Sequence, residues 1–112
     1  MPSELGQLIR ATRTKKEIGL REFARRIEKS PAFVTQLECD DEVPSVAEET
    51  LRRIADELEL DQGKLFVLAH RTPRDLVPAT ETEFALYRRV KAMTLAEQRR
   101  LLTELGERRR KT

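Results

Sequence analysis

His70, Tyr87 and Cys39 are the only histidine, tyrosine and cysteine in the 112-residue sequence. Catalytic sites combine nucleophiles, bases or metal ligands, yet the sequence has neither a glycine-rich phosphate loop nor a repeated carboxylate–histidine pattern. A lone histidine at the end of a predicted helix is more often a partner of the helix C-terminus than a base. The single cysteine excludes an intrachain disulfide and a cysteine-based zinc site. The sequence therefore predicts a protein that is not an enzyme and needs no cofactor or metal.

Charged residues are segregated along the chain, although the net charge is only +2. Residues 1–37 carry a net +4, residues 38–63 a net −8 and residues 64–112 a net +6. The basic N-terminal block favours an anionic partner, whereas the acidic middle repels one. No apolar run approaches the roughly 20 residues that span a bilayer, and no signal-peptide pattern opens the sequence. We expect a cytoplasmic protein without a membrane partner.

Apolar residues recur at helical spacing throughout, and no segment has the periodicity of a strand. Ser3, Ser30 and Asp61 are predicted to begin helices, with Pro31 at the first position of its helix. Capping boxes are predicted at Ser45–Glu48, Thr80–Glu83 and Thr94–Glu97. Gly106 is expected to end the last helix and to leave residues 107–112 as a frayed basic tail.

The sequence IGLREFARRI at residues 18–27, followed by SPAFVTQLE at residues 30–38, resembles the Cro/C1-type (XRE-like) helix-turn-helix family. Residues 44–45 and 50–58 continue the resemblance, which covers residues 4 to about 70. It implies an all-α protein with a five-helix lambda-repressor-like DNA-binding domain and a C-terminal two-helix extension. We expect the DNA-binding domain at 1–71, a linker at 72–79 and a helical hairpin with a basic tail at 80–112.

The resemblance also implies which positions hold the domain together. Ala24 matches the small residue where the two helices of the motif cross, and Val34 and Leu37 match the buried side of the recognition helix. Arg13 and Glu38 match an arginine–glutamate pair in relatives, which assigns Arg13 to the domain framework rather than to DNA. Loss of either partner would leave an uncompensated, partly buried charge.

The outward face of the same helix is implied to contact DNA. Base readout is assigned to Gln36, Thr35, Ala32 and Pro31, and phosphate contacts to Ser30, Lys15, Lys16, Arg21 and Lys29. Gln36 is the best candidate for direct readout, because its amide can make two hydrogen bonds to adenine. Phe33 can either pack against the domain or contact a thymine methyl group.

The sequence departs from the family pattern in three places, two single residues and one loop. Glu28 stands where the family usually has the glycine of the turn between the two helices, so we expect a slightly altered turn. Leu20 stands at the start of the second helix, where the family often has a glutamine that bonds DNA. The loop after the recognition helix is normally basic and contains glycine, but here it is Cys39-Asp40-Asp41-Glu42. These carboxylates would repel phosphate, so the loop turns away from DNA, rejects non-cognate sites or binds another partner. Acidic neighbours favour a structural rather than a redox role for Cys39.

A single helix-turn-helix of this size contacts few base pairs, and such domains usually dimerise on two half-sites. The two C-terminal helices supply a candidate homodimer interface, although they can instead pack on their own monomer; its residues are Phe84, Tyr87, Val90, Leu95, Leu101, Leu102 and Leu105. The predicted function is a nucleoid-associated repressor or autoregulator bound to a palindromic operator in double-stranded DNA. The alternative is an antitoxin or adaptor that uses the same fold to bind a protein partner.

Overall fold

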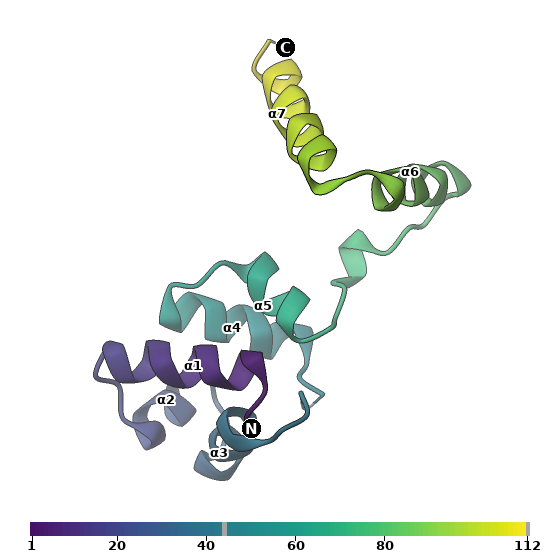
Figure 1. The fold of residues 1–112 in the computed structure, drawn as a ribbon. Helices are drawn as coiled ribbons and strands as arrows, with labels where there is room; N and C mark the ends of the chain where they lie inside the picture. Colours follow the sequence, from purple (N-terminus) through teal and green to yellow (C-terminus); the bar gives the residue numbers. More distant parts are fainter. Residues whose placement is uncertain (44, 112) are drawn as a thin grey trace. The chain divides into compact units, whose positions relative to one another are not determined.

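A computed structural model describes residues 1–43 and 45–111, which contain seven α-helices, one short 3₁₀ helix and no strand. The chain divides into two compact units, an N-terminal unit of residues 1–75 and a C-terminal unit of residues 76–112. The N-terminal unit (Figure 1) contains α1 (Glu4–Lys15), α2 (Leu20–Arg26), α3 (Pro31–Cys39), α4 (Glu48–Leu58) and α5 (Gln62–Leu68). The all-α fold is as predicted.

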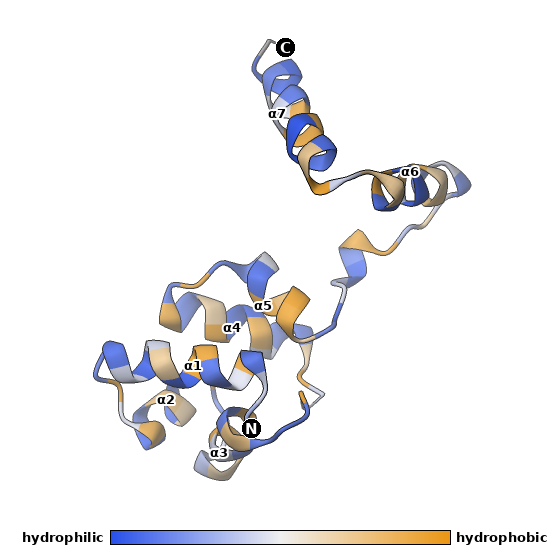
Figure 2. Ribbon diagram, in the orientation of Figure 1, coloured by the Kyte–Doolittle hydropathy of each residue, from blue (hydrophilic) through white to orange (hydrophobic). Residues whose placement is uncertain are grey.

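The N-terminal unit has one hydrophobic core. Helix α1 packs against α3, α4 and α5, α2 packs against α3, and α4 packs against α5. Helical spacing brings apolar residues from all five helices to this core, where the largest fully buried side chains include Phe23, Leu5, Ile9, Leu37, Ile54 and Leu65. Hydropathy colouring shows the same alternation along these helices, with hydrophilic residues between the hydrophobic ones (Figure 2).

Gly6 sets the distance between α1 and the end of α3. A Cβ atom at this position would lie 2.5 Å from the carbonyl oxygen of Leu37 and 3.0 Å from that of Glu38. Both atoms belong to the backbone, so no side-chain rotation can relieve the overlap. Only glycine permits this approach, and nothing in the local sequence pattern marks Gly6 for this role.

Most helix starts match the predictions. The side chains of Ser3, Ser30, Asp61 and Thr80 accept backbone hydrogen bonds at the starts of α1, α3, α5 and α6. In the Thr94–Glu97 capping box, Thr94 accepts from the Glu97 amide at 3.2 Å and Glu97 accepts from the Thr94 amide at 2.8 Å. Short side chains with an oxygen near their own backbone explain this success.

Two predicted helix ends are wrong. Helix α4 begins at Glu48 with Ala47 as its N-cap in extended conformation, and Val46 before it is already buried in the core. The Glu48 carboxylate is therefore free to accept a hydrogen bond from the Arg74 amide at 3.0 Å. Gly106 does not end α7, which continues to Lys111, so residues 107–111 are helical rather than a frayed tail. Basic residues near a helix C-terminus complement its dipole and offset the cost of an internal glycine.

The C-terminal unit consists of α6 (Glu81–Ala92) and α7 (Leu95–Lys111), and the 3₁₀ helix Arg74–Leu76 lies at the junction of the two units. Gln98 of α7 donates a hydrogen bond to the Val90 carbonyl at 2.7 Å, which links the start of α7 to the end of α6. No residue of α6 is buried. The described part of this unit therefore has no closed hydrophobic core.

Candidate nucleic-acid interface

Helices α2 and α3 form a helix–turn–helix held by buried residues on both sides. Phe23 and Ala24 of α2 are buried against the core, together with Val34 and Leu37 of α3. The turn between them keeps the backbone geometry that glycine favours, because Glu28 adopts a φ of 57° in the left-handed region. A non-glycine residue in this region costs about 1 kcal/mol or more. The turn is thus strained at Glu28 rather than rebuilt.

The two faces of α3 differ in chemistry. Val34, Leu37 and Glu38 point into the domain and are buried. The four residues assigned to base readout are all exposed: Pro31, Ala32, Thr35 and Gln36. Pro31 occupies the first helical turn, and Ser30 accepts a hydrogen bond from the Phe33 amide at 3.1 Å. The helix therefore presents one continuous solvent-facing surface with a capped N-terminus.

Arg13 is held within the domain by three hydrogen bonds. Its guanidinium donates to both carboxylate oxygens of Glu38, at 2.7 and 2.9 Å, and to the Ile18 carbonyl at 2.9 Å. The side chains of Arg13 and Glu38 are 12% and 3% exposed. The hydrogen bond that Arg13 donates to Glu38 raises the pKa of Arg13 above its ordinary value. This arrangement ties α1, the α1–α2 turn and the end of α3 together and uses three of the five N–H donors of Arg13 within the domain.

The residues assigned to phosphate contacts have different environments. Lys16 forms an ion pair with Glu59 at 3.5 Å and is 30% exposed, so part of its charge is compensated. Lys29 lies over the Phe33 ring, with its ammonium 5.4 Å from the ring centroid. Lys15 and Arg21 are exposed, and within the described residues neither forms an ion pair. These two side chains are the most available cations of the set.

Phe33 packs against the hydrophobic core and is partly buried. The Lys29 ammonium covers part of its ring. Of the two roles considered for Phe33, these contacts favour packing. Apart from Cys39 at its end, the exposed surface of α3 then consists of the four residues assigned to base readout.

The acidic loop after α3 is attached to the start of the chain. The Ser3 amide donates to the Asp40 carbonyl at 3.0 Å, and the N-terminal ammonium pairs with Asp41 at 3.1 Å. Both groups of the second contact are almost fully exposed, so it contributes at most about 1 kcal/mol. Cys39 is exposed at the end of α3. One of three loop carboxylates thus has its charge compensated, and the loop remains an acidic surface.

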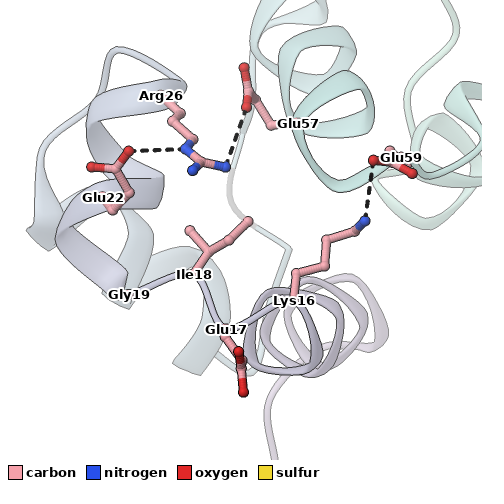
Figure 3. A pocket seen from close by; sticks show the side chains of 8 residues that line it. All are labelled: Lys16, Glu17, Ile18, Gly19, Glu22, Arg26, Glu57 and Glu59. Carbon is pink, nitrogen blue, oxygen red and sulfur yellow. Dashed lines mark hydrogen bonds and ion pairs between the residues drawn. The ribbon is translucent and has the colours of Figure 1, made fainter.

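A polar hollow of about 570 Å³ lies beside the α1–α2 turn and the end of α4 (Figure 3), and none of its lining residues belongs to α3. Arg26 pairs with Glu22 at 3.1 Å and with Glu57 at 3.9 Å, while Lys16 pairs with Glu59 across the opening. Hydrogen bonds from Arg25 and Arg26 lower the pKa of Glu22. Each cation is already paired with a carboxylate, and no group of side chains suited to a metal occurs among the described residues.

The residues assigned to the dimer interface lie in the C-terminal unit. Phe84, Tyr87, Leu95, Leu102 and Leu105 are between 49% and 71% exposed, whereas Val90 and Leu101 are partly covered. Leu86, which was not in the predicted set, is also 61% exposed. These side chains therefore leave large apolar groups exposed on both helices of the unit. None of the described helices is long and apolar enough to span a membrane.

Comparison with solved structures shows that the fold is a known one. A chain of the SinR protein/SinI protein complex matches 94% of this chain and 97% of its own length, with a TM-score of 0.51 and 14% sequence identity. The clp gene regulator ClgR from Corynebacterium glutamicum matches 59% of this chain and 68% of its own, with a TM-score of 0.49 and 27% identity. No protein-family model matches the sequence, and no curated protein matches it. The chain thus shares the all-helical fold of the SinR/SinI chain.

Proposed function

We propose that this protein is a sequence-specific transcriptional regulator of the Cro/C1-type (XRE-like) helix-turn-helix family that binds double-stranded DNA. The observation that carries the proposal is the division of α3 into two faces. Val34, Leu37 and Glu38 fix the helix to the domain, while the opposite face exposes Gln36, whose amide has no hydrogen-bond partner among the described residues. A helix fixed on one side and exposed on the other can enter the major groove, where Gln36 can bond adenine.

Phosphate contacts are proposed to come from groups around this face. Lys15, Arg21 and Lys29 are exposed. In the first turn of α3, Pro31 has no N–H and Ser30 accepts from the Phe33 and Val34 amides, which leaves the Ala32 amide for a phosphate. Lys16 would contribute less, because Glu59 compensates its charge. Contacts of this kind position the protein without selecting sequence, and they make affinity depend on salt.

The protein is further proposed to act as a homodimer on a palindromic operator. The C-terminal unit supports this step, because its two helices expose large apolar side chains and α6 buries none of its residues. Two short helices without a core are marginal in water unless another surface covers them. A second copy would cover them and would supply the two-fold symmetry of a palindrome. Occupancy of a promoter by such a dimer is sufficient for repression or autoregulation.

A protein-interaction module is the second candidate, and two observations favour it. The loop 40–42 presents carboxylates beside α3, where DNA binding calls for positive charge, and the C-terminal unit exposes apolar residues that an unrelated protein could cover. An antitoxin or adaptor would use the same fold without a need for base readout. The two candidate functions are distinguished by duplex DNA, because only the transcriptional regulator should bind it with sequence preference.

Selection from a random duplex pool tests the proposal directly. The full chain should enrich a two-fold symmetric sequence, which is then measured by fluorescence anisotropy at about 50 mM and about 200 mM salt. If about four phosphates are neutralised, affinity should fall on the order of a hundredfold between these concentrations. Binding that is absent or insensitive to salt, with no enriched sequence, would reject DNA binding and favour the protein-interaction module.

A further inference from the structure

The first half of the recognition face of α3 lacks free polar side-chain donors. Pro31 and Ala32 are exposed and carry only aliphatic groups, and Phe33 is partly buried against the core. Ser30 precedes the helix and accepts the Phe33 amide with its side-chain oxygen, which leaves its hydroxyl proton for a phosphate. The side chains of Pro31 and Ala32 can therefore contribute only apolar contact to base recognition.

Thr35 adds a methyl group to the same surface. Its hydroxyl donates a hydrogen bond to the Pro31 carbonyl at 3.1 Å, so its single proton is used within the helix. The side chain is nonetheless exposed, so its methyl group can contact a base, while its hydroxyl oxygen can only accept a hydrogen bond. Thr35 follows Pro31 by four positions, as Gln36 follows Ala32, so apolar and amide groups lie on adjacent strips of one helix face.

We propose that α3 recognises the C5 methyl groups of thymine through Pro31, Ala32 and Thr35, next to an adenine bonded by Gln36. This inference rests on the proposed function and specifies the bases that the site would select. The thymine methyl is the one apolar group that the bases present in the major groove, and alanine and threonine methyl groups are suited to contact it. Each half-site would then contain adjacent A·T pairs.

Substitution of thymine by deoxyuridine tests the proposal without changing the protein. Each thymine of the selected half-site is replaced in turn, which removes only the C5 methyl group and preserves base pairing. Loss of one buried methyl contact should weaken binding about fourfold at a contacted position. Substituted thymines in the flanking sequence serve as controls and should leave affinity unchanged.

A matched pair of variants shows whether the methyl or the hydroxyl group of Thr35 contacts the base. Thr35→Ser retains the hydroxyl and removes the methyl, so it should abolish the thymine–deoxyuridine difference at one position. Thr35→Val retains a methyl and removes the hydroxyl, so it should preserve that difference. Because Thr35 is exposed, both variants should fold, as circular dichroism can verify.

The outcomes separate this inference from the proposed function. Sequence-specific, salt-sensitive binding with no deoxyuridine effect at any half-site position would overturn methyl recognition while leaving DNA binding intact. Loss of specific binding in folded Thr35→Val would assign the hydroxyl as the reader and would also overturn it. Failure to enrich any duplex would reject the proposed function and this inference together.

Discussion

Arg13 and Glu38 form a bidentate ion pair across 25 positions of sequence, with Nε–Oε2 and Nη2–Oε1 distances of 2.7 and 2.9 Å. Glu38 ends the buried side of α3, so the pair fixes the recognition helix to α1. The Ile18 carbonyl accepts the third hydrogen bond of the guanidinium and extends the connection to the start of α2. The Arg13–Glu38 ion pair thus orients α3 from its buried side and lies apart from the exposed face of that helix.

Removing one partner of this pair should be more harmful than removing both. Arg13→Met or Glu38→Leu alone leaves a buried charge without its counter-ion and should cost about 3–5 kcal/mol in urea unfolding. The double variant should cost clearly less than the sum of the two, because no charge remains uncompensated. Strict additivity of the three free energies of unfolding would show that the pair is not coupled.

Base readout and phosphate binding should separate by substitution on the α2–α3 surface. Gln36→Ala should reduce discrimination at one A·T pair by about 1–3 kcal/mol and leave nonspecific affinity nearly unchanged. Arg21→Ala should weaken all duplexes alike and reduce the slope of log affinity against log salt by about 1. Anisotropy titrations against matched and mutated duplexes measure both effects. Uniform weakening by both variants would contradict the assignment of Gln36 to base readout.

The sequence predicted the parts of the fold that depend on local chemistry. Ser3 and Ser30 cap their helices because a short side-chain oxygen reaches amides three residues away, whatever lies around it. The Ser45–Glu48 pattern failed because Val46 is buried before the helix begins, and burial is a tertiary effect that local spacing does not encode. Local spacing also cannot predict the ion pair of Lys16 with Glu59, because three helices lie between these residues in the sequence.

At Gly6, local helix propensity and tertiary packing predict opposite effects of a substitution on stability. Alanine forms helices better than glycine, so local propensity predicts that Gly6→Ala stabilises α1. The 2.5 Å approach to the Leu37 carbonyl predicts the opposite, a loss of about 1–3 kcal/mol in urea unfolding from overpacking. Gly106→Ala is the matched control, because no atom lies within 4 Å of its added Cβ, and it should increase helicity. If Gly6→Ala is as stable as the parent protein, α1 and α3 do not approach as described.

Glu97 should make the helicity of α7 sensitive to acid. Hydrogen bonds from the Thr94 backbone amide and hydroxyl lower the pKa of Glu97 below 4.5. The stabilisation is therefore present above that unfolded-state value and is lost as pH falls through the lower folded-state value. Circular dichroism of Glu97→Gln should lack this component of the acid transition. Glu104→Gln, which removes a mid-helix carboxylate outside the capping box, should retain it, and identical transitions for both variants would contradict the capping role.

Self-association should depend on the apolar side chains of the C-terminal unit. Leu102 is 71% exposed, so Leu102→Glu creates no buried charge in an isolated chain. In a homodimer with Leu102 at the interface, the same change would bury a carboxylate and should weaken dimerisation at least about tenfold. Thr103→Glu adds the same charge on an adjacent side of α7 and should leave dimerisation nearly unchanged. Sedimentation equilibrium measures both constants. A parent protein that remains monomeric, or equal dimerisation of the two variants, would exclude Leu102 from a homodimer interface and leave these residues available to another partner.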